Sequence, residues 1–317
     1  MKYFAGIDLG GTFIKCGIVS DGGDLVIKDK IPTGAKRPYA KIAEDMAKLV
    51  RALEKRAGVT VAAAGIGSPG TIDSADGVVV YSNNIKWENV PFAGELERRL
   101  GVPVYMTNDA NAAALGESYA GAGKNFESSI FLTLGTGVGG GIVLDGKLYE
   151  GGRSAGAELG HMLVKMNGLR CTCGRRGCLE AYASATALIR QTKSAMKRDE
   201  NSVMWRICGG QLKNVDGKTA FDGMRSGDKT AEKVVDGYIS YLAEGVINLC
   251  NIFRPSAILL GGGICAEGDY LLKPLKEKVA RGVFGGTDYA PVEILIASLG
   301  NDAGVFGAAR LAMLRSN

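Results

Sequence analysis

Two stretches of this 317-residue chain resemble each other: GTFIKCGIVSDG at residues 11–22 and GTGVGGGIVLDG at residues 135–146. When the chain is shifted by 124 residues, the two stretches are identical at seven of twelve positions. Each follows an apolar run and places glycines between two strand-like segments, which predicts a β-hairpin with a glycine turn at its tip. Chance similarity of two glycine-rich hairpins is the plain alternative. The more informative interpretation is a duplicated domain, in which each half opens with such a hairpin.

The segments around the first hairpin alternate between strand and helix patterns. Apolar runs predict strands at 59–67 and 102–109, and apolar residues at helical spacing predict helices over 38–58, 91–100 and 110–120. The pattern restarts at residue 128. Further helices are expected over 183–197, 231–253, 270–281 and 302–314, and the polar segment 198–228 is expected at the surface. This order predicts an α/β protein with mixed sheets that carry helices on their faces.

Composition narrows the class of protein. The chain is 46% hydrophobic, carries a net charge of +5 and has no apolar run of about 18 residues or more, so we expect no membrane span. It has no signal-peptide pattern, which predicts a cytoplasmic protein with reduced cysteines. Its basic residues alternate with acidic ones and form no tract, so we expect no nucleic-acid partner.

Three glycine loops follow apolar, strand-like runs: DLGGT at 8–12, LGTGVGGG at 134–141 and LGGGI at 260–264. Glycines let backbone N–H groups approach phosphate oxygens closely, although each loop alone is equally compatible with a plain tight turn. Residues 135–140 match the G-x-G-x-x-G pattern of dinucleotide-binding folds, but that motif requires a helix directly after it. A strand pattern follows here instead, so we expect a phosphate cradle at hairpin tips and no Rossmann site.

The cysteines form a separate signal. Cys171, Cys173 and Cys178 lie within eight residues, and His161 is the only histidine in the chain. A structural zinc site takes four nitrogen or sulfur ligands, and an imidazole completing this set can only be His161. A disulfide between Cys171 and Cys173 would be strained, and redox catalysis typically uses C-x-x-C, which the chain lacks. The other four cysteines, Cys16, Cys208, Cys250 and Cys265, are expected to be small core residues.

Together these motifs resemble one protein family. DLGGTFIKCGIV, TNDANAAALGE, LTLGTGVGGGIVLDGKLYEGGRSAGAELGHM, CTCGRRGCLEAY and LLGGGI occur in the order found in the ROK (repressor, ORF, kinase) family of sugar kinases. The resemblance covers essentially the whole chain. It implies an α/β chain with the duplicated actin/hexokinase-like (ribonuclease H-like) ATPase fold, two lobes with a cleft between them. Residues 1–108 plus 300–317 would form the small N-terminal lobe, and residues 109–299 the large C-terminal lobe with the zinc motif.

The resemblance also implies a reaction, the ATP-dependent phosphorylation of a hexose, most often glucose to glucose 6-phosphate. Asp109 would be the general base, although Asp just before a helix is also a common N-cap. Asp8 would act on Mg²⁺ through water and Lys15 on phosphate. The nucleotide contacts implied are Asp8, Gly10, Gly11, Thr12, Lys15, Thr136, Gly137, Gly262 and Gly263. The sugar contacts implied are Gly67, Asn84, Asn108, Glu158, His161 and Glu180.

The same resemblance matches the four metal ligands to the family's zinc motif. His161, Cys171, Cys173 and Cys178 would hold a structural Zn²⁺ close to the sugar, with His161 serving both. Arg170, Arg175 and Arg176 surround the cysteines and are expected to offset the negative charge of three thiolates. Stripping the metal is then expected to damage sugar binding before ATP binding.

Some properties stay open at this level. A sibling kinase for fructose, mannose, N-acetylglucosamine or N-acetylmannosamine would carry the same motifs, and the phosphate donor could be polyphosphate. A sugar-sensing DNA-binding regulator of the family is expected to carry a helix-turn-helix before the first strand, whereas that strand begins near residue 3 here. We expect a homodimer or homotetramer.

Overall fold

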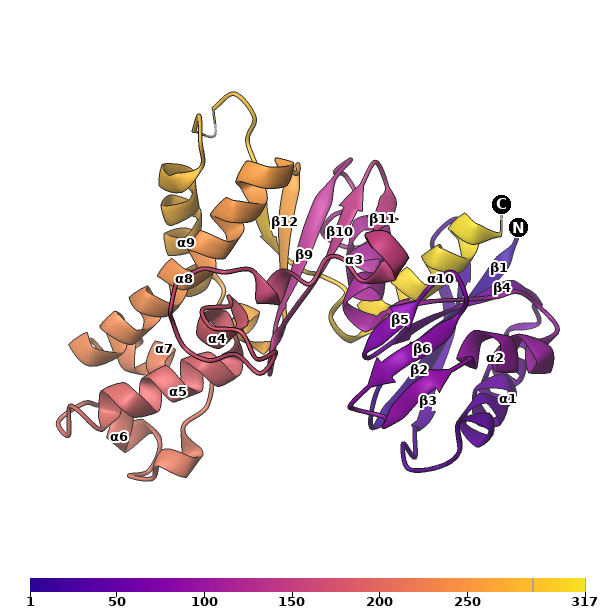
Figure 1. The fold of residues 1–317 in the computed structure, drawn as a ribbon, viewed down its shortest axis with the longest axis horizontal. Coiled ribbons are helices and arrows are strands. Elements are labelled where there is room, and N and C mark those ends of the chain that lie inside the picture. Colours follow the sequence, from indigo (N-terminus) through magenta and orange to yellow (C-terminus); the bar gives the residue numbers. More distant parts are fainter. Residues whose placement is uncertain (287, 317) are drawn as a thin grey trace. The chain divides into compact units, whose positions relative to one another are not determined.

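The computed structural model describes residues 1–286 and 288–316, which divide into two compact units. Unit 1 consists of Met1–Phe131, Gly140–Ala157 and Ala297–Asn317, and unit 2 of Leu132–Gly139 and Glu158–Ile296. Figure 1 gives the elements of both units. The expected lobe boundaries at residues 108 and 300 follow the resemblance and stay a prediction.

Two five-stranded sheets share one strand order. The first runs β3-β2-β1-β4-β8 and the second β11-β10-β9-β12-β13. The strands of the first sheet are β1 (Tyr3–Leu9), β2 (Phe13–Ser20), β3 (Leu25–Pro32), β4 (Val61–Ser68) and β8 (Val104–Asn108). Those of the second are β9 (Ser129–Leu134), β10 (Val138–Leu144), β11 (Lys147–Tyr149), β12 (Ala257–Gly261) and β13 (Glu293–Ile296). The predicted duplication is therefore confirmed at the level of topology.

Each sheet combines antiparallel and parallel pairs. In the first sheet β1 is antiparallel to β2 and parallel to β4, and β4 is parallel to β8. In the second sheet β10 is antiparallel to β11, and β12 is parallel to β13. Parallel strands bring their carboxyl ends to one edge of a sheet, and that edge is where α/β folds usually bind ligands. In unit 1 this edge carries the ends of β1, β4 and β8.

The helices of unit 1 follow the apolar spacing. They are α1 (Tyr39–Ala57), α2 (Phe92–Leu100), α3 (Asp109–Ala120) and α10 (Ala303–Arg315). Helix α1 ends at Gly58, whose φ of 68° is the left-handed conformation that glycine adopts readily. Unit 1 also contains a small sheet of β5 (Thr71–Asp73), β6 (Val78–Ser82) and β7 (Trp87–Val90). The 3₁₀ turns η1 (Gly152–Ser154) and η5 (Gly300–Asp302) and the strand β11 lie in this unit as well.

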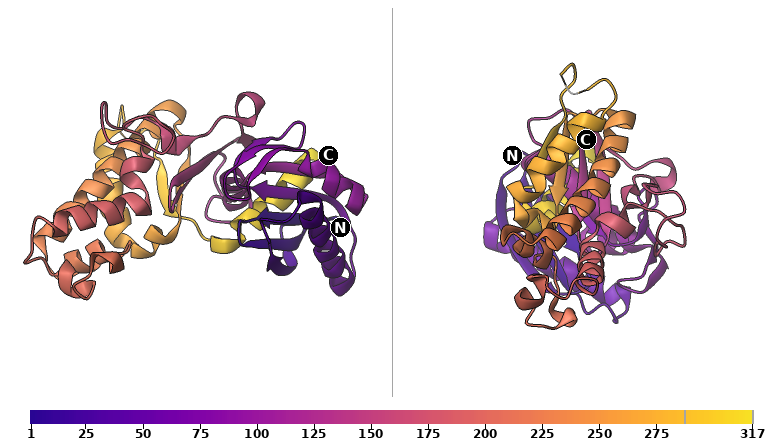
Figure 2. Two further views of the ribbon diagram at one scale, coloured as in Figure 1. Left: turned by 60° about the horizontal axis from the view of Figure 1, so that its bottom comes forward. Right: turned by 90° about the vertical axis from the view of Figure 1, so that its left-hand side faces the viewer.

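Helix α10 packs closely on the first sheet, and the left-hand view of Figure 2 shows it, in yellow, beside the N-terminal strands. A Cβ on Gly6 or Gly65 would collide with the backbone carbonyl oxygen of Val305 or Ala308, respectively. Glycine on the sheet surface thus lets the helix backbone lie directly against β1 and β4. This packing holds the end of β1, where Asp8 lies, against the beginning of α10.

Unit 2 contains the remaining helices. They are α4 (Glu180–Ala183), α5 (Ala185–Met196), α6 (Met204–Ile207), α7 (Thr219–Arg225), α8 (Lys229–Phe253) and α9 (Asp269–Gly282), with 3₁₀ turns η2 (Leu159–His161), η3 (Leu212–Asn214) and η4 (Gly263–Glu267). The helix expected over 183–197 is α5, and it begins two residues later because Ser184 has an extended backbone and caps α5, its side chain accepting from the Ala187 N–H.

The expectation that 198–228 lies at the surface is wrong in part. Met204 and Phe221 are fully buried, and α6 and α7 belong to the core of unit 2. Gly223 of α7 lies so close to Met204 and Ala231 that its Cβ would be 2.7–2.8 Å from their side chains. Helix α7 thus packs between α6 and the long helix α8.

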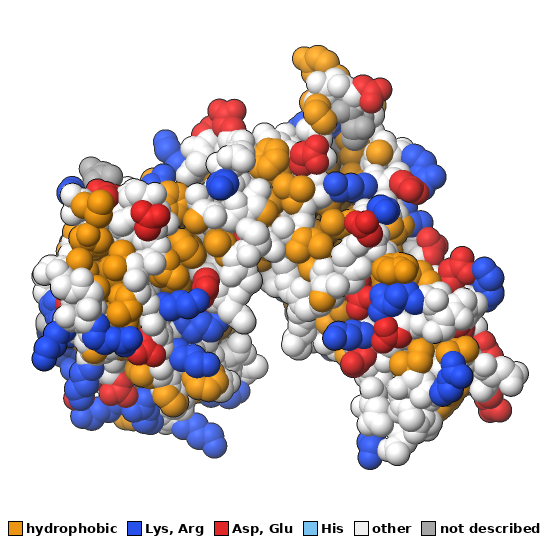
Figure 3. All heavy atoms as spheres, turned by 180° about the vertical axis from the view of Figure 1, so that it is seen from behind, with side chains coloured by type: hydrophobic (Ala, Val, Ile, Leu, Met, Phe, Trp, Pro, Cys, Tyr) orange, Lys and Arg blue, Asp and Glu red, His pale blue; other side chains and the backbone are white. Residues whose placement is uncertain are grey.

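Charges are distributed over the surface. On the face shown in Figure 3, Lys and Arg side chains are interspersed with Asp and Glu. Several form ion pairs, among them Lys41 and Lys48 with Glu44, and Arg98 and Arg99 with Glu95. Within residues 1–286 and 288–316, no helix is long and apolar enough to cross a membrane.

Candidate active site and metal cluster

The first glycine loop connects β1 to β2 and is closed by its own backbone. The Gly10 N–H donates to the Phe13 carbonyl at 3.0 Å, and Thr33 Oγ1 donates to the Gly10 carbonyl at 2.6 Å. Asp8 lies opposite Lys15 in the hairpin, and Lys15 Nζ is 2.9 Å from Asp8 Oδ2. The loop thus presents a part-buried carboxylate and an ammonium group side by side.

Asn108, and not Asp109, caps helix α3. The side-chain oxygen of Asn108 accepts from the N–H groups of Ala110 at 2.8 Å and Asn111 at 3.4 Å, and its amide donates to the Gly70 carbonyl at 2.9 Å. The alternative that Asp109 is the N-cap is therefore wrong. Asp109 is exposed as the first residue of α3, where its Oδ1 accepts from the Ala110 N–H at 2.8 Å. The cap of α3 therefore does not depend on the Asp109 side chain.

Gly67 connects the phosphate side of unit 1 with Asp109. It pairs with Asp8 between β1 and β4 and with Thr107 between β4 and β8. A Cβ at this position would lie 2.8 Å from the Cβ of Ala112 and 3.7 Å from the Cα of Asp109. The absence of a side chain at Gly67 lets α3 begin directly over the ends of these strands.

Asn84 is exposed in the turn between β6 and β7, beside the first glycine loop. A Cβ on Gly11 would lie 3.9 Å from the Cβ of Asn84. The neighbouring Asn83 faces elsewhere, because its Oδ1 accepts from Lys86 Nζ at 2.8 Å. Trp87, three residues on, is buried against Phe92 with ring centroids 4.6 Å apart, which fixes the turn on the core.

The second and third glycine loops meet in unit 2. The Gly135 N–H donates to the Gly137 carbonyl at 3.0 Å, and Thr186 Oγ1 donates to the Thr136 carbonyl at 2.8 Å. Gly262 has a φ of 94°, and a Cβ there would collide with the Leu134 carbonyl. The turn after β12, which continues through Gly263 into η4, therefore lies directly against the end of β9.

Glu180 connects the second glycine loop with the cysteine loop, residues 171–178. Its Oε2 accepts from the Val138 N–H at 3.1 Å, and its Oε1 accepts from Thr172 Oγ1 at 3.0 Å. A Cβ on Gly137 would collide with Glu180 Oε2. Nothing in the sequence pattern indicated a role for Thr172, although its position between Cys171 and Cys173 could have suggested one.

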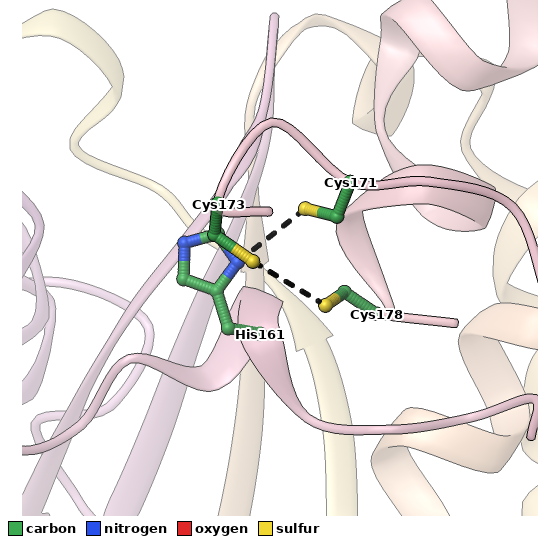
Figure 4. A group of neighbouring side chains, drawn as sticks. All are labelled: His161, Cys171, Cys173 and Cys178. Atoms are coloured by element: carbon green, nitrogen blue, oxygen red, sulfur yellow. Dashed lines mark hydrogen bonds between the residues drawn. The ribbon is translucent and has the colours of Figure 1, made fainter. Parts of the chain in front are cut away.

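The four predicted metal ligands come together in unit 2 (Figure 4). One potential ligand atom from each of His161, Cys171, Cys173 and Cys178 lies within 4.8 Å of all the others. Cys171 Sγ is 3.7 Å from His161 Nδ1, and Cys173 Sγ is 3.7 Å from Cys178 Sγ. Tetrahedral zinc with bonds of about 2.3 Å to sulfur and about 2.0–2.1 Å to nitrogen separates sulfur pairs by about 3.8 Å and sulfur–nitrogen pairs by about 3.6 Å. The donor set and its spacing fit Zn²⁺.

The loop around these ligands is tightly hydrogen-bonded. The Cys171 N–H donates to the Arg175 carbonyl at 2.8 Å, and Glu158 begins the turn whose His161 N–H donates back to its carbonyl at 3.0 Å. A hydrogen bond from the Arg175 backbone lowers the pKa of Cys173, while burial raises the pKa of Cys178 to about 12. The two thiols therefore differ in how readily they ionise.

The arginines around the cysteines bind carbonyl oxygens. Arg175 Nη1 donates to the His161 carbonyl at 3.4 Å and Arg176 Nη1 to the Gly168 carbonyl at 3.3 Å, and Arg170 forms a β-bridge with Arg176. That they offset thiolate charge stays a prediction. The other four cysteines are buried, as predicted, and burial raises the pKa of Cys16 to about 12.

Two sheets of equal strand order, each opening with a glycine-tipped hairpin, define the class of protein: a duplicated actin/hexokinase-like ATPase fold. A model of the ROK family matches residues 4–315, and the chain belongs to that family. Glucokinase of Thermotoga maritima is 41% identical over 314 residues, which cover 96% of each chain.

Two solved structures of ROK family sugar kinases have the same fold. A ROK family glucokinase from Streptomyces griseus, in complex with glucose and AMPPNP, is 35% identical with a TM-score of 0.78 and covers 98% of this chain and 99% of its own. A ROK hexokinase from Thermus thermophilus is 36% identical with a TM-score of 0.83 and covers 99% of both chains. The predicted family and fold class are confirmed.

Proposed function

We propose that this protein is an ATP-dependent hexose kinase that converts glucose to glucose 6-phosphate. The observation that best supports this is the position of Asp109. Its carboxylate is exposed at the end of β8 beside Gly67, and Gly67 pairs with Asp8. A proposed general base and a candidate Mg²⁺ contact thus lie at the ends of the two strands, β8 and β1, that flank β4 in unit 1. The similarity to glucokinases favours glucose as the acceptor.

The chemical step transfers one proton to Asp109 and one phosphoryl group to glucose. Asp109 accepts the proton of the glucose 6-hydroxyl while that oxygen forms a bond to the γ-phosphorus of ATP. The bond from phosphorus to the bridging oxygen breaks, and ADP leaves with its electron pair. Bound Mg²⁺ would neutralise charge on the phosphate oxygens, and the part-buried Asp8 carboxylate is an oxygen ligand of the kind this ion prefers. Lys15, paired with Asp8, would supply further positive charge.

The remaining residues position the two substrates. Backbone groups of the three glycine loops, with Thr12 and Thr136, would hold the phosphates, and Gly262 and Gly263 the adenosine side. Asn84, Asn108, Glu158, His161, Glu180 and Gly67 would contact the sugar. Asn108 would do so while capping α3, because its amide NH2 has a second N–H besides the one that donates to the Gly70 carbonyl.

We further propose that His161, Cys171, Cys173 and Cys178 hold a structural Zn²⁺. The ion would keep all four side chains in place and hold Cys178 as a thiolate despite its burial. Since Nδ1 of His161 is the nitrogen next to Cys171, Nε2 is the nitrogen left for a sugar hydroxyl. Metal analysis of the purified protein should give about one zinc per chain, and a chain without zinc would refute this part.

The decisive experiment is a panel of hexoses and phosphate donors. Glucose, fructose, mannose, N-acetylglucosamine and N-acetylmannosamine are each tested with ATP and with polyphosphate, and sugar phosphate is measured. We expect the highest kcat/KM with glucose and ATP. A preference for another hexose would make the protein a sibling kinase. No turnover, together with salt-dependent binding to duplex DNA, would indicate a regulator. The cytoplasm and a homodimeric or homotetrameric state stay predictions.

A further inference from the structure

Glu150 follows strand β11, and its carboxylate accepts hydrogen bonds from hydroxyl groups of two distant segments. Its Oε1 accepts from Ser74 Oγ at 2.6 Å and from Thr107 Oγ1 at 2.7 Å. Its Oε2 is 3.5 Å from Arg315 Nη2, and the Glu150 side chain is only 10% exposed. Both hydroxyl donors share one oxygen atom, so this atom joins three parts of unit 1.

The first of these parts is the strand that carries the proposed base. Thr107 is fully buried in β8 and directly precedes Asn108 and Asp109. The hydrogen bond from its hydroxyl to Glu150 ties this position of β8 to the segment after β11. The contact with Glu150 therefore restrains the strand end from which α3 and Asp109 begin.

The second part is the turn after β5, which is bound to the loop after Glu150. The Ser74 N–H donates to Ser154 Oγ at 3.3 Å, and Arg153 Nη2 is 3.5 Å from Asp73 Oδ2. The Glu150 carbonyl also accepts from the Gly156 N–H at 2.8 Å. This set of contacts holds residues 151–157, the loop that leads directly into Glu158.

The loop has a backbone that needs such support. Arg153, Ser154 and Ala157 have φ values of 51°, 57° and 61°. Residues other than glycine rarely adopt this backbone conformation, and they persist in it only where surrounding contacts determine the backbone. Three such residues within five positions indicate a loop whose shape depends on the contacts that hold it. Glu150 supplies two of these contacts, one through its carboxylate to Ser74 and one through its carbonyl oxygen to Gly156.

We propose that Glu150 is a positioning residue for the hexose. Its Oε1 fixes both the strand end before Asp109 and the loop before Glu158, and it acts as a hydrogen-bond acceptor more than as a charge. The ion pair with Arg315 is long and Arg315 is half exposed, whereas the two hydroxyl contacts are short. This inference rests on the proposed hexose kinase function.

The test compares Glu150→Ala with Glu150→Gln, which keeps an acceptor oxygen. In Glu150→Ala we expect KM for glucose to rise about tenfold with KM for ATP within about twofold, because the lost contacts lie on the sugar side. Glu150→Gln should stay within about threefold of the wild type for both substrates. Thr107→Val, which removes one donor and keeps the shape, should give a smaller rise in glucose KM.

Three results would overturn the proposal: an unchanged glucose KM in Glu150→Ala, an equal rise of both KM values, or Glu150→Gln as impaired as Glu150→Ala. Hydrogen exchange of the unliganded variants supplies a readout that needs no activity. Exchange in residues 104–109 and 150–157 should accelerate together in Glu150→Ala and in neither segment in Glu150→Gln, while 229–253 is unchanged. Acceleration in one segment alone would contradict the link. A wild type that phosphorylates no hexose would refute the function and leave the exchange result decisive for Glu150.

Discussion

The carboxylate of Glu180 lies next to the thiol of Cys171, with Oε1 and Sγ 3.6 Å apart. The same oxygen accepts from Thr172, and the other carboxylate oxygen accepts from the Val138 N–H at the end of the second glycine loop. A residue proposed to hold the sugar is thus positioned from one side by the cysteine loop. A change in that loop can therefore reach Glu180 through two contacts, those of Cys171 and Thr172 with Oε1.

Removal of zinc should therefore weaken sugar binding first. After chelation we expect the Kd for glucose to rise about tenfold, because Glu180 loses the partners that orient it. The Kd for a non-hydrolysable ATP analogue should change by less than about threefold. Calorimetric titration of both ligands measures the difference, Cys178→Ser should reproduce it, and added zinc should reverse it in the wild type. Chelated protein that keeps its glucose affinity would separate the metal from the sugar site.

Asp109→Asn should abolish most turnover and leave the fold intact. The amide cannot accept the hydroxyl proton, so kcat should fall by about 10²–10⁴. Because Asn108 is the cap of α3, the melting temperature should stay at the wild-type value. Asn108→Ala is the matched variant, and it should lower the free energy of unfolding by about 1 kcal/mol. Steady-state kinetics and thermal unfolding of both variants decide the assignment, which retained turnover in Asp109→Asn would reject.

Gly137→Ala should impair glucose binding by displacing Glu180. The added methyl group would collide with Glu180 Oε2, so the carboxylate must move away from Val138. We expect the Kd for glucose, measured without nucleotide, to rise about tenfold. Gly135→Ala is the control in the same loop, because a Cβ there meets no atom within 4 Å. Equal glucose affinity in both variants would show that Glu180 tolerates the displacement.

Asp228 should make the stability of the protein depend on pH. It caps α8 by accepting from the N–H groups of Thr230 and Ala231, and it also accepts from Ser202 Oγ and the Val203 N–H, both at 2.6 Å. Burial acts to raise its pKa, but these hydrogen bonds outweigh burial and the pKa is lowered. Its stabilisation is therefore present above the unfolded-state pKa of about 4 and is lost as pH falls through the lower, folded-state value.

Urea unfolding of Asp228→Ala tests this dependence. At pH 7 the variant should lose about 1–2 kcal/mol of unfolding free energy relative to the wild type, and the difference should shrink toward pH 3. Asp269→Ala, at the exposed start of α9, should cost less than about 0.5 kcal/mol at either pH. A difference between Asp228→Ala and wild type that is equal at both pH values would contradict the assignment.

Ala157→Gly should stabilise the protein. Ala157 has a φ of 61°, which costs an alanine about 1–2 kcal/mol and glycine little. The greater entropy of glycine in the unfolded chain offsets part of this, so we expect the free energy of unfolding to rise by about 0.5–1 kcal/mol. Ala155, in the same loop, has a φ of −103°, so Ala155→Gly should be neutral or destabilising. Denaturant unfolding of the pair provides the comparison, and destabilisation by both changes would argue against strain at Ala157.

The features that were predictable from sequence are those that depend on local chemistry. Glycine turns between alternating strands identified both hairpins, and a rare set of one histidine and three cysteines identified the candidate metal site. Asn108 and Asp109 are both good capping residues, so only the backbone at the end of β8 decides which one caps α3.

The features that were missed depend on distant partners. Glu150 contacts Ser74 and Thr107 across 76 and 43 residues, and no pattern in the chain links them. The helices α6 and α7, of four and seven residues, are too short to show a helical period. Met204 and Phe221 are buried in a three-helix contact in which α7 packs on both α6 and α8.

The shared strand order of the two sheets locates where the halves diverged. In the first sheet the connection from β3 to β4 is residues 33–60 and holds one helix, α1. The equivalent connection from β11 to β12 is residues 150–256, and it contains Glu158, His161, all three clustered cysteines and Glu180. Lengthening a surface connection costs little loop-closure entropy. This one connection therefore carries the proposed zinc ligands together with Glu158 and Glu180, whereas Gly67, Asn84 and Asn108 of the proposed sugar site lie in the first half.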